Sequence, residues 1–284
     1  MHFQWYPGHM TKAKRMMQEN IKLIDLVIEL VDARIPVSSR NPDIDELGKN
    51  KSRLILLNKA DLAEDKWNDA WAEYFREKGF FVVKVNSKKG GGLKSIQGVI
   101  QEACKEKMER DRKRGILNRP VRAMVVGIPN VGKSTFINKY VGKVTAKTGD
   151  KPGVTRGKQW IKLKKDFELL DTPGILWPKF EDPKAGLNLA FCGSIKDEVL
   201  DTATLAMELI GVLQAEYPAE LMERYKLTEI SETPLATMED IAGKRGFILP
   251  GKRIDYERCG RTVLDEFRSG KIGNITLEKL SKQV

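Results

Sequence analysis

Residues 127–134, Gly-Ile-Pro-Asn-Val-Gly-Lys-Ser, constrain the fold of this chain more than any other stretch. They fit the pattern G-x-x-x-x-G-K-[ST]. The apolar residues 121–126 before them predict a buried strand, and residues 135–140 after them predict the start of a helix. In such a turn the backbone N–H groups point inward and hold phosphate oxygens, and the helix N-terminus adds partial positive charge. A chance glycine-rich turn would lack this context, so the stretch predicts a nucleotide-binding phosphate loop.

The residue types within this phosphate loop predict separate roles. Lys133 would reach the β- and γ-phosphates, and the hydroxyl of Ser134 would bind Mg²⁺. Gly127 and Gly132 would let the backbone approach the phosphates closely. The loop residues that we expect to contact the nucleotide are Asn130, Val131, Gly132, Lys133, Ser134 and Thr135.

The first 120 residues alternate between strand and helix patterns. We expect strands at 25–31, 53–57 and 80–85, and helices at 11–22, 65–78 and 93–114. This alternation favours a mainly parallel sheet with right-handed crossovers, in which ligands bind at the carboxyl ends of the strands. In the helix at 65–78, Trp67, Trp71 and Phe75 share one face, which predicts core packing.

Asn58-Lys-Ala-Asp61 follows the second strand and has the residue types needed to recognise guanine. The Asp61 carboxylate would accept hydrogen bonds from the ring N–H and the exocyclic amine. Adenine offers no such pair of donors, so the carboxylate would be left unpaired. The stem of Lys59 would cover the base. Asn86-Ser-Lys88, after the third strand, would supply a backbone N–H to the guanine carbonyl. The residues that we expect at the base are Asn58, Lys59, Ala60, Asp61, Asn86, Ser87 and Lys88.

Two segments after the phosphate loop are predicted to face the γ-phosphate. Residues 142–157 are too polar and glycine-rich to be buried, and so long a loop is usually functional. Thr155 in that loop is our candidate for a second hydroxyl ligand of Mg²⁺. Residues 159–163 and 167–170 predict a hairpin that ends in Asp171-Thr-Pro-Gly174. Asp171 would hold Mg²⁺ through water, and the N–H of Gly174 would sense the γ-phosphate, so the three motifs together predict a GTPase.

The order of the motifs is unusual, because the base-reading residues precede the phosphate loop. The sheet tolerates this order only if the usual termini are joined by residues 93–120 and new termini open elsewhere. The prediction is therefore an α/β fold, a circularly permuted Ras-like P-loop GTPase domain at 1–178, followed by a smaller all-α domain at 179–284. The helices that we expect there are 184–191, 197–215, 218–226, 237–242, 255–268 and 275–282.

Composition limits the cellular compartment and the class of partner that we expect. Three cysteines without metal-ligand spacing indicate a reducing cytoplasm, and no apolar run approaches the roughly 18 residues of a membrane helix. The first residues lack the pattern of a signal peptide. The chain has 50 basic and 39 acidic side chains, which suggests a polyanionic partner such as nucleic acid. We expect a monomer that does not bind membranes.

The motifs together resemble those of the circularly permuted GTPases, and most closely the bacterial ribosome biogenesis GTPase A family, also called the YlqF type. The resemblance covers essentially the whole chain. It implies a cytoplasmic GTPase that acts late in assembly of the large ribosomal subunit, contacts ribosomal RNA, and is released or switched on GTP hydrolysis. The matching stretches are Trp5-Tyr-Pro-Gly-His-Met10, Asp32-Ala-Arg34, Asn58-Lys-Ala-Asp61, Gly127 to Ser134, Pro152-Gly-Val-Thr-Arg156 and Asp171-Thr-Pro-Gly174.

The distribution of charge agrees with an RNA partner. Residues 1–174 have 35 basic and 21 acidic side chains, and residues 244–284 have 10 and 5. Without a recognisable RNA-binding signature, recognition would be by shape and phosphate contact. For any single residue, a solvated helix face is an equal alternative. The candidate contacts are Lys12, Lys14, Arg15, residues 110–114, Lys147, Lys151, and the pairs Lys244-Arg245 and Lys252-Arg253.

Catalysis needs a polar group that the usual position does not supply. Many GTPases have a water-orienting glutamine after the DxxG motif, but here Gly174 is followed by Ile175. His9, which we expect in a turn near the N-terminus, is our candidate, and the family resemblance also indicates it. The alternative is a structural or RNA-contacting histidine. Because nothing fixes His9 near the phosphates, we expect slow hydrolysis until the ribosomal particle docks.

A monovalent cation is a further hypothesis. Asn130 occupies a position that resembles the potassium-coordinating asparagine of potassium-activated GTPases, and K⁺ could offset charge in the transition state. An ordinary loop asparagine is the alternative.

Two rival functions also stay open. One is a GTPase of tRNA modification or metabolism, for which further motifs are missing. The other is an RNA-binding switch whose hydrolysis is only a timer.

Overall fold

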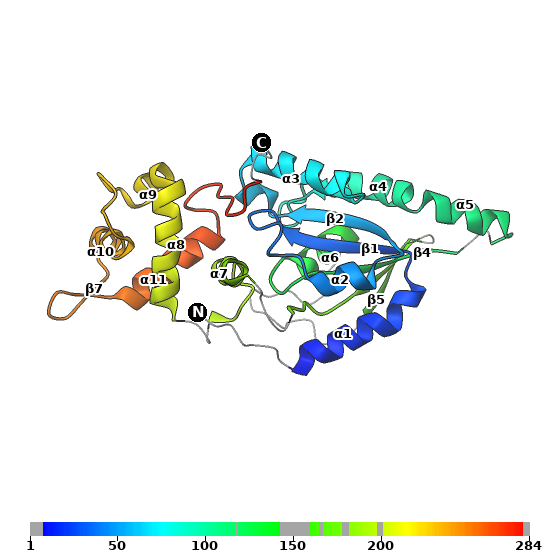
Figure 1. The fold of residues 1–284 in the computed structure, drawn as a ribbon, viewed down its shortest axis with the longest axis horizontal. Helices are drawn as coiled ribbons and strands as arrows, with labels where there is room; N and C mark the ends of the chain where they lie inside the picture. The colour runs from blue at the N-terminus through cyan, green and yellow to red at the C-terminus, as the bar shows by residue number, and fades with distance from the viewer. Residues whose placement is uncertain are drawn as a thin grey trace. The chain divides into compact units, whose positions relative to one another are not determined.

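The computed structural model describes residues 8–116, 119–142, 159–164, 167–177, 182–197 and 201–280 (Figure 1). The chain divides into two compact units. The first comprises Met1–Gly186 together with Thr276–Val284, and the second is Leu187–Ile275. None of the helices in the described part of the chain has the length and hydropathy needed to cross a membrane.

Among its described residues the first unit contains a six-stranded sheet with the order β3-β2-β1-β4-β6-β5. Every neighbouring pair is parallel except β5 and β6, which form the predicted antiparallel hairpin. All residues of β1 are buried, as expected for an apolar strand covered on both faces. The strands are β1 (Leu26–Asp32), β2 (Ser52–Asn58), β3 (Phe81–Lys84), β4 (Val121–Val126), β5 (Gln159–Lys164) and β6 (Phe167–Asp171).

Helices of the first unit bury apolar faces as the sequence predicts. Helix α3 lies over β2 (Figure 1). It packs on β2 and β3 through Trp71 and Phe75, with Trp67 partly buried, which confirms the predicted core packing. The helix predicted at 93–114 is instead broken, because Cys104 leaves the helical conformation between α4 and α5. The helices are α1 (Gly8–Asn20), α2 (Pro42–Leu47), α3 (Asp65–Glu77), α4 (Ile96–Ala103), α5 (Lys105–Lys113), α6 (Lys133–Val141) and the start of α7 (Pro183–Phe191).

In its described residues the second unit is helical, with one short hairpin. Its core contains Leu209, Leu213, Val263 and Phe267, and helices α8 and α11 pack closely because Gly260 presents no side chain to the Thr202 carbonyl. The elements after α7 are α8 (Thr202–Glu216), α9 (Pro218–Tyr225), α10 (Pro234–Arg245), β7 (Ile248–Leu249), β8 (Arg253–Ile254) and α11 (Tyr256–Arg268).

The end of the chain differs from the sequence prediction. The helix expected at 275–282 is absent from its described residues, 275–280. Residues from Thr276 onward belong to the first unit, and the first boundary lies between Gly186 and Leu187 rather than near residue 178. The predicted division at 178/179 therefore misses both points at which the chain passes between the units. The apolar spacing of Ile272, Ile275 and Leu280 is typical of a helix. The backbone of residues 276–280 instead bonds to distant parts of the chain, as described below.

Candidate nucleotide-binding site

The predicted motifs meet at the carboxyl edge of the first unit's sheet. Asp32, the last residue of β1, is in register with Asn58, the last residue of β2. On the other side of β1, strand β4 leads into the phosphate loop, and Asp171 at the end of β6 is in register with Val125 of β4. Parallel strand order alone brings these ends together, although Asp32 and Asp171 lie 139 residues apart in the sequence.

The phosphate loop has the backbone that its glycines predict. Gly127 and Gly132 have φ angles of 149° and 98°, which favour glycine. A Cβ at Gly132 would lie 2.4 Å from the side-chain nitrogen of Asn58, and one at Gly127 would lie 2.7 Å from the Leu30 carbonyl oxygen. Asn130 also has a positive φ, of 62°. The loop therefore packs against β1 and β2 too closely for side chains at either glycine.

Lys133 lies inside the phosphate loop. Its Nζ donates to the carbonyl oxygens of Gly127 and Ile128, at 3.0 and 2.8 Å. The side chain is buried, and this desolvation lowers its pKa from the ordinary 10.5 to about 8, although the nearby Asp171 carboxylate opposes the shift. A buried ammonium group that donates to two loop carbonyls is well suited to bind a phosphate oxygen.

Asp171 is the complementary buried acid. Its side chain is 1% exposed, and neither carboxylate oxygen makes a hydrogen bond of normal geometry within the described residues. Burial raises its pKa to about 6, even though Lys133 lowers it. Oxygen ligands and water are what Mg²⁺ prefers. A buried carboxylate whose oxygens accept no hydrogen bond of normal geometry from the described residues, close to the helix that bears Ser134, therefore fits the predicted role of holding Mg²⁺ through water.

Asn58 connects three loops of the site through hydrogen bonds of its side chain. Its Nδ2 donates to the carbonyl oxygen of Val131 in the phosphate loop, at 2.8 Å. Its Oδ1 accepts from the backbone N–H and the hydroxyl of Ser87, at 3.1 and 2.8 Å. The side chain is buried. Since the N–H of Ser87 is used in this way, Lys88 is the residue of the pair whose N–H we expect to face the base.

A buried ion-pair cluster, which sequence reasoning did not identify as such, supports the base-reading loop. Asp32 accepts from the Arg34 Nε and Nη2 at 3.0 and 2.8 Å, and its Oδ2 lies 2.9 Å from the Nζ of Lys59. The two cations beside Asp32 hold the pKa of its carboxyl well below the usual range despite complete burial. The signal was the Asp32-Ala-Arg34 stretch, which we matched to the family without assigning it a contact.

The remaining base-reading residues lie nearer the surface. The Asp61 side chain is 32% exposed, and its Oδ2 lies 3.8 Å from the Nζ of Lys89. This carboxylate is partly accessible, so a bound base would itself complete its burial. Asn86 shapes the turn before Lys88, because its side chain accepts from the Lys89 N–H at 2.9 Å.

The Asp171-Thr-Pro-Gly174 motif touches the phosphate loop through its backbone. A Cβ at Gly174 would lie 2.8 Å from the Nζ of Lys133 and 2.9 Å from the backbone of Pro129. Ile175 and Leu176, which follow, are buried and apolar. The two positions directly after Gly174 therefore hold apolar side chains, which cannot orient a water molecule.

Some predicted residues cannot be placed. Thr155, Lys147 and Lys151 fall outside the described residues. His9 is in the first turn of α1, not in the turn that we expected, and its side chain also falls outside the described part of the molecule.

Comparison with known proteins identifies the family. Residues 122–238 match a family model described as 50S ribosome-binding GTPase. Ribosome biogenesis GTPase A of Bacillus cereus is 50% identical over 98% of this chain and 94% of its own length. The chain belongs to the ribosome biogenesis GTPase A family. A relative of the same name from Thermotoga maritima is 32% identical over 97% of this chain and 94% of its own.

Solved structures support the same assignment. A structure titled as GDP-bound YlqF matches with a TM-score of 0.67 and 27% identity, over 93% of this chain and 99% of that one. One titled as GNP-bound YlqF from T. maritima matches with a TM-score of 0.64 and 29% identity, over 94% and 98%. The family membership confirms a circularly permuted GTPase fold with a helical region, guanine-nucleotide binding and hydrolysis, and a role in ribosome biogenesis.

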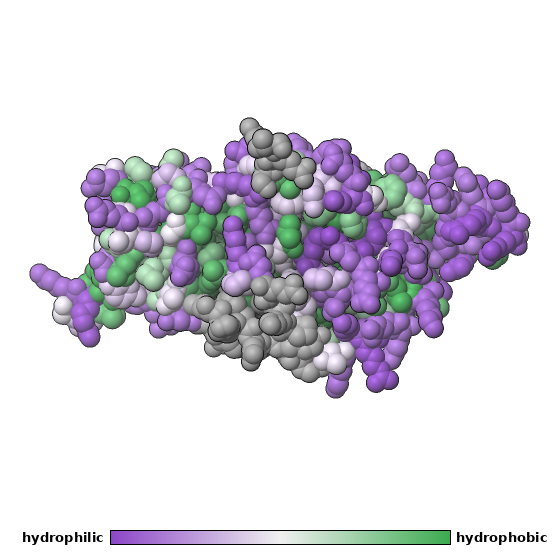
Figure 2. Space-filling model, in the orientation of Figure 1, coloured by the Kyte–Doolittle hydropathy of each residue, from purple (hydrophilic) through white to green (hydrophobic). Residues whose placement is uncertain are grey.

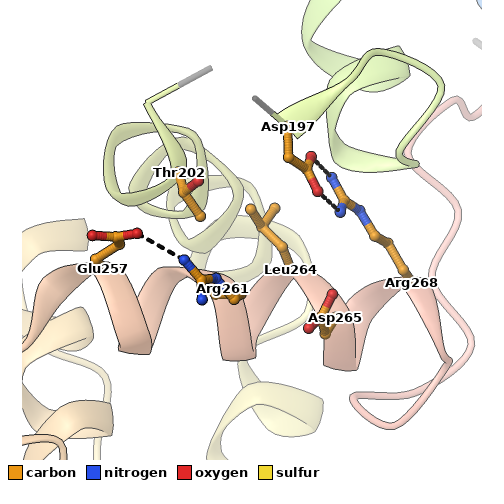
Figure 3. Close-up of a pocket in the computed structure, with 7 residues that line it drawn as sticks. All are labelled: Asp197, Thr202, Glu257, Arg261, Leu264, Asp265 and Arg268. Carbon is orange, nitrogen blue, oxygen red and sulfur yellow. Dashed lines mark hydrogen bonds and ion pairs between the residues drawn. The ribbon is translucent and has the colours of Figure 1, made fainter. Parts of the chain in front are cut away.

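The helical unit of this family member has a surface pocket of its own (Figure 3). Two arginines in it are engaged by acids of the same pocket, since Arg268 forms two contacts of 2.7 Å with Asp197 and Arg261 lies 2.7 Å from Glu257. Asp265 adds a further negative charge. The pocket is thus a poor site for a phosphate group.

Proposed function

We propose that this protein is a GTP-hydrolysing assembly factor that binds the large ribosomal subunit and its rRNA and is released or switched by GTP hydrolysis during late maturation. The observation that carries the proposal is the meeting of Asn58, the phosphate loop and Asp171 at one sheet edge. The description of the matching family model as a 50S ribosome-binding GTPase supports the partner. The protein would act in the cytoplasm as a monomer.

In this proposal each group of site residues contacts a different part of the nucleotide. Asp61 reads the guanine edge, the Lys59 stem covers the base, and the Lys88 N–H faces the base carbonyl. Lys133 leaves its two loop carbonyls to bind β- and γ-phosphate oxygens, which are stronger partners for an ammonium group. Ser134, Thr155 and Asp171 would hold Mg²⁺, which when bound neutralises charge on the β- and γ-phosphates.

Asn130 supports the potassium hypothesis through its backbone. A positive φ of 62° in a non-glycine residue marks a constrained position within the loop. In the proposal the Asn130 side-chain oxygen helps to coordinate K⁺ between the phosphates. Hydrolysis rates in potassium chloride should exceed those in sodium chloride, and equal rates would remove the cation from the mechanism.

His9 is the proposed catalytic residue. Its place in the first turn of α1 puts it near the start of a rigid element, whose Met10, Ala13 and Met17 are buried. Neutral imidazole orients water, and imidazolium stabilises developing charge. Docking on the large subunit would place His9 at the γ-phosphate, so that hydrolysis reports correct docking.

The test is multiple-turnover hydrolysis with and without purified large subunits. Wild-type protein should be stimulated, and His9→Ala should bind nucleotide and particles normally but lose about 100-fold of the stimulated rate. Gln18→Ala, a change at an exposed residue of the same helix, is the matched control. Full stimulation of His9→Ala would shift catalysis to a group of the ribosome. Absence of stimulation in the wild-type protein would instead favour a simple RNA-binding switch.

Two exposed basic regions are the proposed RNA contacts. The α5 end of the first unit is strongly hydrophilic (Figure 2) and includes Arg110, Arg112 and Lys113. The β7–β8 hairpin of the second unit exposes Lys252 and Arg253 beside Ile248 and Leu249. Arg245 is the weaker candidate, because it already lies 3.3 Å from the Glu266 carboxylate.

Sedimentation with large subunits tests these contacts. The double change Lys252→Glu and Arg253→Glu should weaken co-sedimentation in the presence of a GTP analogue and reduce its dependence on salt. Reversal of charge at Lys66 and Lys78, two exposed lysines on and after α3, is the matched control. Equal sedimentation of both double variants would exclude the hairpin from the contact.

A further inference from the structure

Residues 276–280, which follow the last residue of the helical unit, pack on the nucleotide-binding unit, and we call them the strap. The N–H of Leu277 donates to the carbonyl oxygen of Arg34 at 2.9 Å. The hydroxyl of Thr276 accepts from the N–H of Glu64 at 3.1 Å, and the Nε1 of Trp71 donates to the carbonyl oxygen of Glu278 at 2.8 Å. These contacts span more than 200 residues of sequence and hold an irregular backbone in place.

Glu278 makes the most concentrated set of contacts in the strap. Its carboxylate accepts from the backbone N–H groups of Val37 and Ser38, at 2.6 and 3.0 Å, and from the Ser38 hydroxyl. A carboxylate that receives consecutive backbone N–H groups fixes the local chain strongly, because each bond is charge-assisted. The loop that it fixes begins directly after the Asp32-Ala-Arg34 stretch.

The strap therefore contacts two segments that are connected to the base-reading loop. On one side it holds the Arg34 backbone, and the Arg34 side chain holds Asp32, whose Oδ2 lies 2.9 Å from the Lys59 Nζ. On the other side it holds Glu64, which precedes α3, and packs Leu280 on the apolar cluster that Ala60 also contacts. Residues 58–61 lie in the chain between these two anchored points.

We infer that Glu278 is a positioning residue for guanine recognition, and that the strap sets the geometry of the Asn58-Lys-Ala-Asp61 loop. The inference rests on the proposed role of Asp61 in reading the base. Glu278 acts through Arg34, Asp32 and Lys59 and does not touch the nucleotide. Since Thr276 directly follows the helical unit, the strap also gives that unit a direct chain connection to the base-reading end of the site.

The test compares the affinities of full-length protein for GDP, IDP and ADP by titration of the intrinsic tryptophan fluorescence. IDP lacks the exocyclic amine that Asp61 would bind, so the ratio of GDP to IDP affinity reports the position of that carboxylate. We expect Glu278→Ala to lower this ratio about fivefold, with a smaller loss for Glu278→Gln, which keeps one acceptor oxygen. Glu102→Ala, at an exposed glutamate of α4, is the matched control.

The outcomes separate this inference from the proposed function. If the wild-type protein does not prefer GDP to ADP, the proposed base-reading site itself is wrong. If the wild type prefers GDP and Glu278→Ala keeps its GDP-to-IDP ratio, the strap has only a structural role and the inference fails, whatever the change in melting temperature. A lowered ratio for both Glu278 variants, with unchanged Glu102→Ala, supports it, and Glu278→Gln provides this readout if Glu278→Ala does not fold.

Discussion

The two ends of the nucleotide site differ in how their polar groups are satisfied. At the base end, Asn58 makes three hydrogen bonds and Asp32 is held by Arg34 and Lys59. At the phosphate end, Asp171 lacks hydrogen-bond partners of normal geometry among the described residues, and Lys133 is buried against two carbonyls. Both phosphate-end groups have shifted pKa values because burial disfavours their charged forms.

This difference indicates a division of labour. A base end whose loops are already bonded to one another loses little entropy on binding, so it can discriminate between bases by geometry. A phosphate end that contains buried charges gains a large free energy when phosphates and a cation arrive. Specificity would thus be set before binding, and affinity would come mainly from relief of unsatisfied charge.

The largest expected effect tests specificity at the base end. Asp61→Asn removes a charged acceptor of two hydrogen bonds, so affinity for GTP should fall about 1,000-fold. Xanthosine triphosphate should gain affinity, because the amide complements its altered edge. Competition titrations with both nucleotides measure the exchange. Normal GTP binding by this variant would show that Asp61 does not read the base.

The next effect concerns affinity at the phosphate end. Lys133→Met should weaken GTP binding about 100-fold, through loss of a charge-assisted contact of about 3 kcal/mol. The free protein should not be destabilised, since below pH 8 the buried ammonium opposes folding, as its lowered pKa shows. Thermal unfolding with and without GTP checks both statements. A large loss of stability in the free variant would mean that Lys133 already stabilises the empty loop.

A smaller effect is expected where the two ends are joined. Asn58→Ala leaves the Val131 carbonyl and both Ser87 donors without their partner, which should cost about 2–3 kcal/mol of unfolding free energy. Asn20→Ala is the matched control, because the hydrogen bond that this buried asparagine makes within the described residues goes to a carbonyl of its own helix. Denaturant unfolding gives both values. Similar losses in the two variants would contradict the idea that Asn58 braces the site.

Sequence reasoning predicted most of the sheet and the placement of the motifs because both depend on local patterns. Apolar strands such as β1 and the phosphate loop each have a signature within ten residues. It did not predict the strap or the Asp32 cluster, since these depend on contacts between distant residues. Thr276 binds Glu64, and Leu277 binds Arg34, across more than 200 residues. The break of the predicted helix at Cys104 shows a similar limit of periodicity.

The strap also changes how the helical unit should be tested. Removal of everything after residue 178, which the sequence alone would suggest, deletes Thr276 and Glu278 together with the helices. Loss of nucleotide specificity in such a truncation would then reflect the base end of the site rather than the helical unit. Surface substitutions such as those at Lys252 and Arg253 avoid this ambiguity.

The smallest expected effect is the release or uptake of protons at the phosphate end when the nucleotide binds. Burial raises the pKa of Asp171 to about 6 and lowers the pKa of Lys133 to about 8, so both groups are mainly charged between these values. Bound Mg²⁺ favours the charged acid, and bound phosphate favours the charged lysine. Binding should therefore release a fraction of a proton at about pH 5.5 and take one up at about pH 8.5. Calorimetric titration of Mg·GDP in buffers with different ionisation enthalpies measures both fractions. The phosphate itself titrates near pH 6, so the acid limb is read as the difference from Asp171→Asn, and the alkaline limb as the difference from Lys133→Met. If neither variant differs from the wild type, the buried pair does not supply the binding energy, and the contrast between the two ends of the site fails.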